Sequence, residues 1–364
     1  MSRLLLDVMG GDHAPSAILD GALLALEDLQ YPLVLLGDEE VIRAHPIAQH
    51  LDQFSGKSAP FAKVTLIHAP DIIGMEDKIK ALRSKPNAPI NVGTKLVAES
   101  WAAFHAGTGT PDAFISAGHS GAVMASALLT LGRIRGAERP AIATRLPTTN
   151  GKGVICLDVG ANVDCKPEHI RDFAIMGALL CSALSPATSR PKVSILANGE
   201  ERTKGNDTTR AAYALLESHP LFQAGGIGEF VGYSEAKEMF KGDVDVVTMD
   251  GFIGNLILKN SEALGSALLQ IMKTEAKKNP LNRIGFGLAF GALKSFKKKV
   301  DFREVGAAPL LGVKGYIFIA HGRSDRIAIR NSLLRAQEAL QAKMVERLEV
   351  ALAPTFAVSA PVTT

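Results

Sequence analysis

Five short apolar runs in this sequence end in the same kind of loop, in which Asp, Ser or Asn stands close to Gly. The loops lie at residues 7–12 (DVMGGD), 115–121, 157–162, 197–204 and 249–255. Glycine allows close approach of the backbone to a ligand, and the amides of such turns bind anions. Loops at the carboxyl ends of parallel strands meet at one edge of a sheet. The pattern predicts that these loops converge on one anion-binding cleft; the alternative is that each is only a turn.

Hydroxyl groups, amides and carboxylates in these loops are the candidate phosphate- and substrate-binding groups. The segment 115–124 matches neither the dinucleotide-binding nor the ATP-binding glycine pattern, so it favours a simpler anion. In the segment 7–15 the alternative is a tight turn in which Asp12 caps the following helix. The candidate residues are Gly10, Gly11, Asp12, His13, Ser116, Gly118, Ser120, Gly121, Asp158, Asn162, Asp250 and Gly254.

Two further side chains are candidates for the chemistry itself. Lys204 stands in a Gly/Asn turn after a strand, where an ammonium group can neutralise a phosphate or a charged transition state. Asn255 falls in the first turn of a helix, where its amide can donate to a carbonyl group or accept from a phosphate hydroxyl. The alternatives are a solvated lysine and a helix-capping asparagine. His13 and His321 follow strands and have the pKa range for acid–base work, although single histidines are more often structural.

Composition excludes several classes of protein. Lys and Arg number 40 against 37 Asp and Glu, and the resulting charge of +3 argues against a dedicated nucleic-acid binder. No cluster has metal-ligand spacing, and no GxSxG elbow is present, so we expect neither a metal site nor a serine hydrolase. There is no signal-peptide core and no apolar run of the roughly 18 residues that a membrane span needs. We therefore expect a cytoplasmic protein.

The elements that position these residues read as alternating strands and helices. The strand-like runs are continuously apolar, which is typical of a parallel sheet covered on both faces and predicts a doubly wound α/β fold. Strands are expected at 3–8, 31–38, 63–69, 112–118, 141–147, 154–160, 192–199, 244–251 and 315–322. Helices are expected at 14–29, 253–277 and 324–348. We expect a single domain over 1–350 and a flexible tail over 351–364, with only a weak boundary signal at 148–153.

A helical hairpin at about 252–300 interrupts the strand–helix alternation and is expected to project from the body. Its second half combines apolar residues and glycines with a basic end, a pattern typical of segments that lie on anionic lipid. Phe286, Phe290, Leu293 and Lys297 are the candidate membrane contacts. The alternative is the buried tip of a dimer interface.

Six segments, taken in order, resemble the bacterial phosphate acyltransferase family that begins phospholipid synthesis. They are DVMGGDHAP (7–15), SAGHSGA (116–122), RPAIA (139–143), LDVGANVDCKPEH (157–169), NGEERTKGN (198–206) and DGFIGN (250–255). The resemblance runs from residue 3 to about 345. Two segments depart from the family pattern: Val8 stands where the family usually has Ala, and His119 and Ser120 stand where it usually has Asn and Thr.

The resemblance implies a reaction in which an acyl group moves from an acyl carrier protein thioester to inorganic phosphate. The acyl phosphate would supply a membrane glycerol-3-phosphate acyltransferase. The implied fold is that of phosphotransacetylases and of isopropylmalate and isocitrate dehydrogenases. The implied enzyme is a homodimer without a cofactor, peripherally bound to membrane. Lys204 and Asn255 match the family's proposed catalytic positions.

The carrier protein is acidic, so its docking surface should be basic. Arg171, Arg202 and Arg210 stand near the candidate loops, and Lys294 to Lys299 form a second basic patch; the sequence does not choose between them. Three other functions remain open: a phosphotransacetylase that uses acyl-CoA, a nicotinamide-dependent decarboxylating dehydrogenase, and an inactive membrane-associated scaffold.

Overall fold

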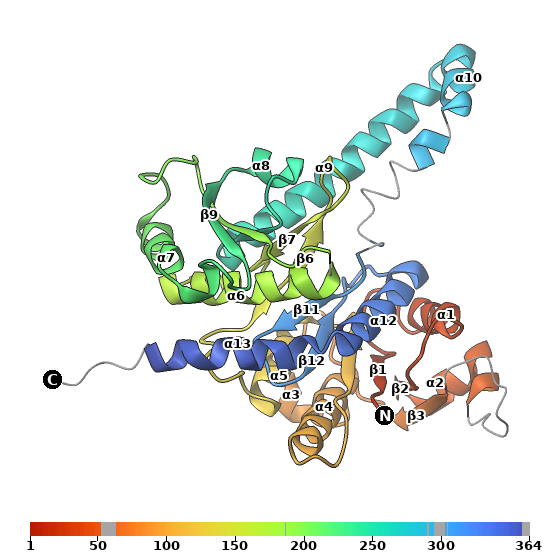
Figure 1. Cartoon of the computed structure of the whole chain (residues 1–364). Helices are drawn as coiled ribbons and strands as arrows, with labels where there is room; N and C mark the ends of the chain where they lie inside the picture. Colours follow the sequence, from red (N-terminus) through yellow and green to blue (C-terminus); the bar gives the residue numbers. More distant parts are fainter. Residues whose placement is uncertain (52–62, 186, 290, 295–302, 304, 359–364) are drawn as a thin grey trace.

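The computed structural model describes residues 1–51, 63–185, 187–289, 291–294, 303 and 305–358, and these residues form two sheets flanked by helices (Figure 1). The first sheet has the strand order β3 (Val64–His68), β2 (Leu33–Gly37), β1 (Leu4–Asp7), β4 (Ala113–Ser116), β12 (Tyr316–Ile319), β11 (Ala308–Leu311), β5 (Ala141–Ile142). The second has the order β6 (Thr144–Leu146), β7 (Val154–Leu157), β10 (Val246–Thr248), β8 (Lys192–Leu196), β9 (Glu229–Ser234). Antiparallel pairing is limited to β11 and β6 among the described strands, so the expected mostly parallel α/β fold is confirmed.

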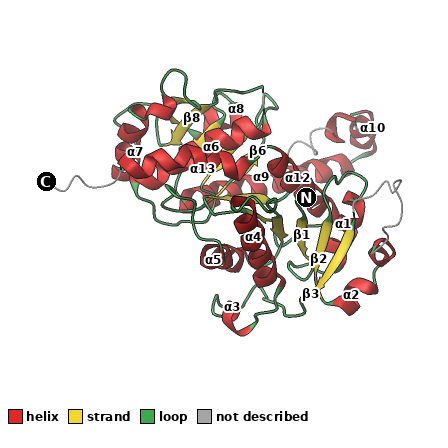
Figure 2. Cartoon of the chain, turned by 60° about the horizontal axis from the view of Figure 1, so that its bottom comes forward, coloured by secondary structure: helices red, strands yellow, loops and turns green. Residues whose placement is uncertain are grey.

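Helices flank the first sheet (Figure 2), and alternating residues of its strands are buried in two different clusters. Leu4 and Leu6 of β1 are buried with α1 (Ser16–Ala25) and α12 (Arg326–Gln341). Leu5 points the other way, toward α4 (Pro89–His105) and α5 (Ser120–Thr130). A strand that is apolar at every position is therefore required, because both of its faces leave water.

The second sheet is also covered by helices, and it shares its core with the first. One face packs on α6 (Pro167–Leu184), which in turn contacts α7 (Asp207–Glu217) and α13 (Met344–Val358). The other face meets α8 (Ala236–Lys241) and the start of α9 (Gly251–Lys277). Because one hydrophobic cluster includes residues of both sheets, we infer that they belong to one folding unit. Smaller elements are α2 (Glu39–Arg43), η1 (Pro46–His50), α3 (Ala81–Ser84) and η2 (Pro220–Phe222).

Four elements differ from the sequence-based expectations. The run 141–147 is not one strand: β5 pairs with β11 and β6 pairs with β7, so the chain changes sheets at the buried Ala143. The strands β9 and β11 were not predicted, since Gly232 interrupts the first and Pro309 the second. The helix expected at 324–348 is broken after Gln341, because Lys343 adopts a φ of +51°. Its second part, α13, continues to Val358, within the segment expected to be a flexible tail.

The predicted hairpin projects from the body along α9 toward α10 (Pro280–Leu288), as Figure 1 shows. Asn279 caps α10 by accepting from the Asn282 amide at 2.7 Å, and the Asn282 side chain donates to the Glu275 carbonyl at 2.9 Å. Of the 27 residues of α9, only Gly251 and Gly254 are fully buried. Within the described residues, no helix has both the length and the apolar character needed to cross a bilayer.

The attachment of α9 to the second sheet depends on Gly254. A Cβ at this position would lie 1.8 Å from the Asp158 carbonyl oxygen, whereas a Cβ at Gly265 of the same helix would meet nothing within 4 Å. We predict that Gly254→Ala destabilises the protein by about 1–3 kcal/mol through overpacking. Gly265→Ala, the matched control, should be neutral or stabilising by up to about 1 kcal/mol. Urea denaturation of both variants checks this, and equal effects would contradict it.

Candidate active site

The side chain of Asp158 organises the loop that follows β7. It is fully buried, and its carboxylate accepts five hydrogen bonds of 2.7–3.2 Å. Four come from the amides of Ile142, Gly160, Ala161 and Asn162, and the fifth comes from the Asn162 side chain. Burial raises the pKa of Asp158, and these hydrogen bonds offset part of that rise. Asp158 was predicted to bind substrate; in the structure its buried carboxylate fixes the course of the loop.

The loop after β10 and the start of α9 place Asn255 against that loop. The Gly251 amide donates to the Asn162 carbonyl at 2.7 Å, and Asp250 caps α9 by accepting from the Ile253 amide at 2.8 Å. Asn255 itself is exposed, and its Oδ1 would lie 3.8 Å from a Cβ built on Gly160. Gly160 and Asn255 are therefore direct neighbours, and a Cβ at 160 would be in ordinary van der Waals contact with the Asn255 side chain.

Lys204 is held by the loop that follows β8. Asn198 closes this loop by accepting from the Gly205 amide at 2.9 Å, and Gly205 has a φ of +79°. The aliphatic part of Lys204 lies over Gly199, where an added Cβ would come within 2.7 Å of the Lys204 Cγ. The Lys204 side chain is 42% exposed, and its ammonium lies 3.9 Å from the Glu201 carboxylate. The lysine is positioned by its backbone but remains accessible to an anion.

Lys204 and Asn255 lie at the same edge of the second sheet without touching. Their strands, β8 and β10, are direct neighbours and run parallel, so both loops leave from the carboxyl edge. Among the described residues, no hydrogen bond or ion pair joins the two side chains. The two side chains thus stand on adjacent loops at one edge of the sheet and are not tied to each other.

At the first sheet, a buried Asp again holds the loop that follows its strand. Asp7 accepts from the Ser116 hydroxyl at 2.7 Å, and Ser116 Oγ accepts from the Gly118 amide at 3.0 Å. A Cβ on Gly10 would lie 2.7 Å from the Gly118 nitrogen, so the loops after β1 and β4 pack backbone against backbone. Asp7 and Ser116 are thus buried supports beneath the glycines of the predicted anion site.

The remaining candidates in the loops of the first sheet lie closer to the surface than Asp7 and Ser116. Asp12 and His13 are exposed, Gly11 has a φ of +109°, and the Asp12 amide donates to the Gly322 carbonyl at 2.7 Å. His119 caps α5 by accepting from the Ala122 amide at 3.2 Å. The histidine thereby performs the capping that asparagine favours at such positions. Ser120 and Gly121 follow in the first turn of α5, and Ser120 is exposed.

A polar cluster joins the two halves. Lys259 of α9 places its Nζ 3.1 Å from His321 Nε2, in the loop after β12. Glu262, also of α9, lies 3.7 Å from His321 and 3.9 Å from the Arg323 guanidinium. Burial and the charge of Lys259 lower the pKa of His321. His321 therefore links the helix of the second sheet to a loop of the first.

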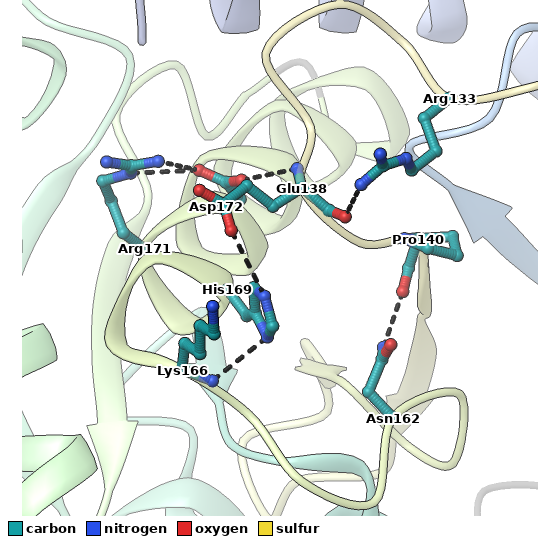
Figure 3. A network of polar contacts seen from close by, with 8 residues as sticks. All are labelled: Arg133, Glu138, Pro140, Asn162, Lys166, His169, Arg171 and Asp172. Atoms are coloured by element: carbon teal, nitrogen blue, oxygen red, sulfur yellow. Dashed lines mark hydrogen bonds and ion pairs between the residues drawn. The ribbon is translucent and has the colours of Figure 1, made fainter. Parts of the chain in front are cut away.

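The segment that carries the chain between the sheets is held by a second network, shown in Figure 3. The Asn162 side chain donates to the Pro140 carbonyl at 2.7 Å, and the Glu138 amide donates to Asp172 at 3.1 Å. Arg171 is buried and hydrogen-bonded to Asp172 at 2.7 Å, and burial raises the pKa of that carboxyl to about 6. Arg171, which belongs to one of the two basic patches that the sequence left open for docking, is thus buried and paired with Asp172.

Within the described residues, no group of three or more His, Cys, Asp or Glu side chains is arranged to hold a metal ion. Of the candidate membrane contacts, Phe286 and Leu293 are half-buried and line a hollow of about 300 Å³ beside α10. Phe290 and Lys297 lie outside the described residues. The exposed apolar side chains of α10 are instead Leu281, Ile284 and Leu288, which sequence spacing did not single out.

The α/β architecture is the fold of phosphotransacetylases. The chain resembles EutD phosphotransacetylase from Staphylococcus aureus, with a TM-score of 0.54, 16% identity and 94% of each chain covered. A phosphotransacetylase from Streptococcus pyogenes gives a TM-score of 0.53 at 12% identity, again with 94% of each chain covered. At these identities the likeness concerns the fold.

Sequence comparison identifies the family. A family model described as fatty acid synthesis protein matches residues 2–347. The phosphate acyltransferase of Pelotomaculum thermopropionicum is 44% identical over 345 residues, which cover 94% of this chain and 93% of the relative. That of Anaeromyxobacter sp. strain Fw109-5 is 42% identical over 358 residues, covering 98% and 92%. The chain belongs to the phosphate acyltransferase family and is a transferase.

The buried Asp7 gives the fold a pH dependence. Burial raises its pKa from 3.8 to about 6, so between these values the folded chain holds a proton that the unfolded chain has released. The stabilising effect of that proton is therefore lost as the pH rises toward 6. We predict that the unfolding free energy of wild type minus that of Asp7→Asn falls, by at most about 3 kcal/mol, between pH 4 and 7.

Urea denaturation of both proteins across this range checks the prediction. Taking the difference cancels the contributions of groups that both proteins share. One of them is Asp325, whose lowered pKa makes stability change with pH in the opposite direction. A difference that stays constant or grows with pH would show that Asp7 does not titrate in this range.

Proposed function

We propose that this phosphate acyltransferase transfers a fatty acyl group from an acyl carrier protein thioester to inorganic phosphate, and that the acyl phosphate enters phospholipid synthesis. Relatives named phosphate acyltransferase, at 40–44% identity over nearly the full length, support the acceptor and the reaction class. The observation that carries the proposal is that Lys204 and Asn255 lie at one edge of the second sheet. Lys204 lies over Gly199 of its own loop, and Asn255 lies beside Gly160 of a neighbouring loop.

In this mechanism a phosphate oxygen attacks the thioester carbonyl carbon. The tetrahedral intermediate then collapses, the carbon–sulfur bond breaks, and the carrier thiol leaves with a proton that phosphate supplied. The ammonium of Lys204 offsets charge on the phosphate, and the Asn255 amide donates to the developing oxyanion. Amides of the loops at 8–13 and 117–121 would hold the phosphate. A thioester is already activated, so each of these steps uses the chain's own residues.

Substitution of the two catalytic candidates tests these roles. We predict that Lys204→Ala and Asn255→Ala each lower kcat for acyl phosphate formation about 10²–10³-fold, the cost of removing one transition-state donor. Lys204→Arg keeps the charge and should retain more activity than Lys204→Ala. Acyl phosphate is trapped with hydroxylamine and counted as hydroxamate. Wild-type rates in both alanine variants would contradict the assignment.

The identity of the donor needs a separate comparison. Acylated carrier protein and acyl-CoA, each supplied with phosphate, separate the proposed enzyme from a phosphotransacetylase-like one. We expect the higher kcat/KM with the carrier protein. A preference for acyl-CoA would favour the alternative, and the absence of acyl phosphate with either donor would favour an inactive scaffold.

We further propose that the enzyme is a cytoplasmic homodimer that binds membrane peripherally and passes acyl phosphate to a glycerol-3-phosphate acyltransferase. The exposed apolar residues of α9, from Phe252 and Leu256 to Leu264, Leu268 and Ile271, support a helix that pairs with a second copy. The exposed Leu281, Ile284 and Leu288 of α10 support contact with lipid, and basic residues near them would meet anionic headgroups.

Replacement of these three α10 residues tests the membrane contact. We predict that Leu281→Ser, Ile284→Ser and Leu288→Ser together reduce flotation with anionic vesicles at least about tenfold, because apolar burial drives interfacial binding. The control replaces Leu129 and Val350, which are equally exposed on other elements, with Ser. Unchanged flotation of the α10 variant, or equal loss in the control, would contradict the proposal.

A further inference from the structure

The segment 71–85, which follows the edge strand β3, forms a rim beside the candidate phosphate site. A Cβ on Gly322 would lie 3.4 Å from the Met75 methyl group and 3.4 Å from Asp12 Oδ1, so Met75 and Asp12 both lie next to Gly322. Ile72 and Ile73 line a small hollow together with Asp7, Met9 and Gly10. This rim segment therefore contacts the loops that we assign to phosphate, and it did not stand out in the sequence.

The rim segment is held in place by its own polar contacts. Lys85 donates to the Ile72 carbonyl at 2.7 Å and to Asp77 at 2.6 Å, and Asp77 accepts from the Gly74 amide at 2.9 Å. Asp71 accepts from the Asn87 amide at 3.0 Å. The Lys85–Asp77 ion pair is neutral as a whole, so Asp71, Glu76 and the cations Lys78, Lys80 and Arg83 set the charge of the segment.

The outer surface combines apolar and basic side chains. Ile72, Met75 and Ile79 are 49%, 48% and 53% exposed, although they are large and apolar. In the helical turn around α3, Ala81 and Leu82 face the core, while Lys78, Lys80 and Arg83 are exposed. Within the part of the chain that the structure describes, none of these three cations forms an ion pair. Lys78, Lys80, Arg83 and Lys85 stand against Asp71, Glu76 and Asp77, so the segment has a net charge of +1, and its three unpaired cations lie around α3.

We propose that the rim segment is the docking surface for the acidic carrier protein that delivers the acyl group. This inference rests on the proposed function. Lys78, Lys80 and Arg83 would meet acidic residues of the carrier, and Ile79 and Met75 would pack against its apolar surface. A carrier seated here would hold its thioester arm beside Asp12 and the phosphate loops. The two other arginines suggested by sequence are engaged elsewhere, Arg202 with Glu217 and Arg210 with Asp207, each at 2.6 Å.

Charge complementarity favours a protein over a lipid surface at this position. The rim adjoins the loops that we assign to phosphate, where an acidic donor must arrive in every turnover. The hairpin, in contrast, carries the longest run of exposed apolar residues and is the surface suited to membrane. Lipid binding at the rim is a separate outcome of the test.

The test compares Lys78→Glu/Lys80→Glu/Arg83→Glu with a control of equal charge change, Lys152→Glu/Lys192→Glu/Lys314→Glu, whose lysines are exposed outside the rim and outside the hairpin. We expect the rim variant to lose at least about tenfold in kcat/KM with acylated carrier protein at low salt, mostly through KM. Its affinity for the carrier by calorimetry should fall in parallel, and the loss should shrink as salt rises. The control should remain near wild type.

A small acyl-pantetheine thioester separates docking from chemistry. The rim variant should turn this donor over as wild type does, because no protein surface is needed. Unchanged carrier affinity in the rim variant would overturn the proposal, as would equal losses with both donors. Loss of vesicle binding in place of carrier binding would overturn it in favour of lipid. If wild type itself makes no acyl phosphate from the carrier, the proposed function fails, whatever the rim variant does.

Discussion

The buried carboxylate of Asp158 is the interaction on which the geometry of the site depends. A charged group inside a protein is costly unless hydrogen bonds satisfy it, and here five of them do. One donor, the Ile142 amide, belongs to the first sheet, and the others belong to the loop after β7. The same residue presents its carbonyl to Gly254, against which α9 is seated. A single residue thus joins the two sheets, shapes a loop and sets the position of Asn255.

Asp7 plays the corresponding part in the first sheet, through Ser116 and the Gly118 amide. In both halves a buried Asp followed by Val stands at the end of a strand, and glycines follow in the loop beyond it. In this arrangement the buried carboxylates hold backbone amides in a fixed orientation. Preorganised amides and a placed lysine stabilise charge without reorganisation during the reaction, which suits a transfer whose nucleophile is itself an anion.

The sequence allowed prediction of the strand-end loops, because continuous apolar runs and glycine-rich turns are local signals. It did not reveal that Asp158 is fully buried, since burial depends on the distant Ile142 amide. Arg171 looked like a docking residue only because its partner Asp172 and the packing of α6 cannot be read from charge alone. The split of 141–147 between two sheets has no local signal either, because Ala143 fits either strand. The rim segment was missed because Met75 and Gly322 are far apart in the sequence. Only their proximity in the fold places the exposed cations beside the candidate phosphate loops.

The central claim is acyl transfer to phosphate, and ³¹P nuclear magnetic resonance with fully ¹⁸O-labelled phosphate tests it most directly. The purified protein is incubated with acylated carrier protein and the labelled phosphate. We expect an acyl phosphate that keeps all the phosphate oxygens, because phosphate attacks the carbonyl carbon and the carbon–sulfur bond breaks. Free fatty acid and carrier thiol without any labelled acyl phosphate would contradict it.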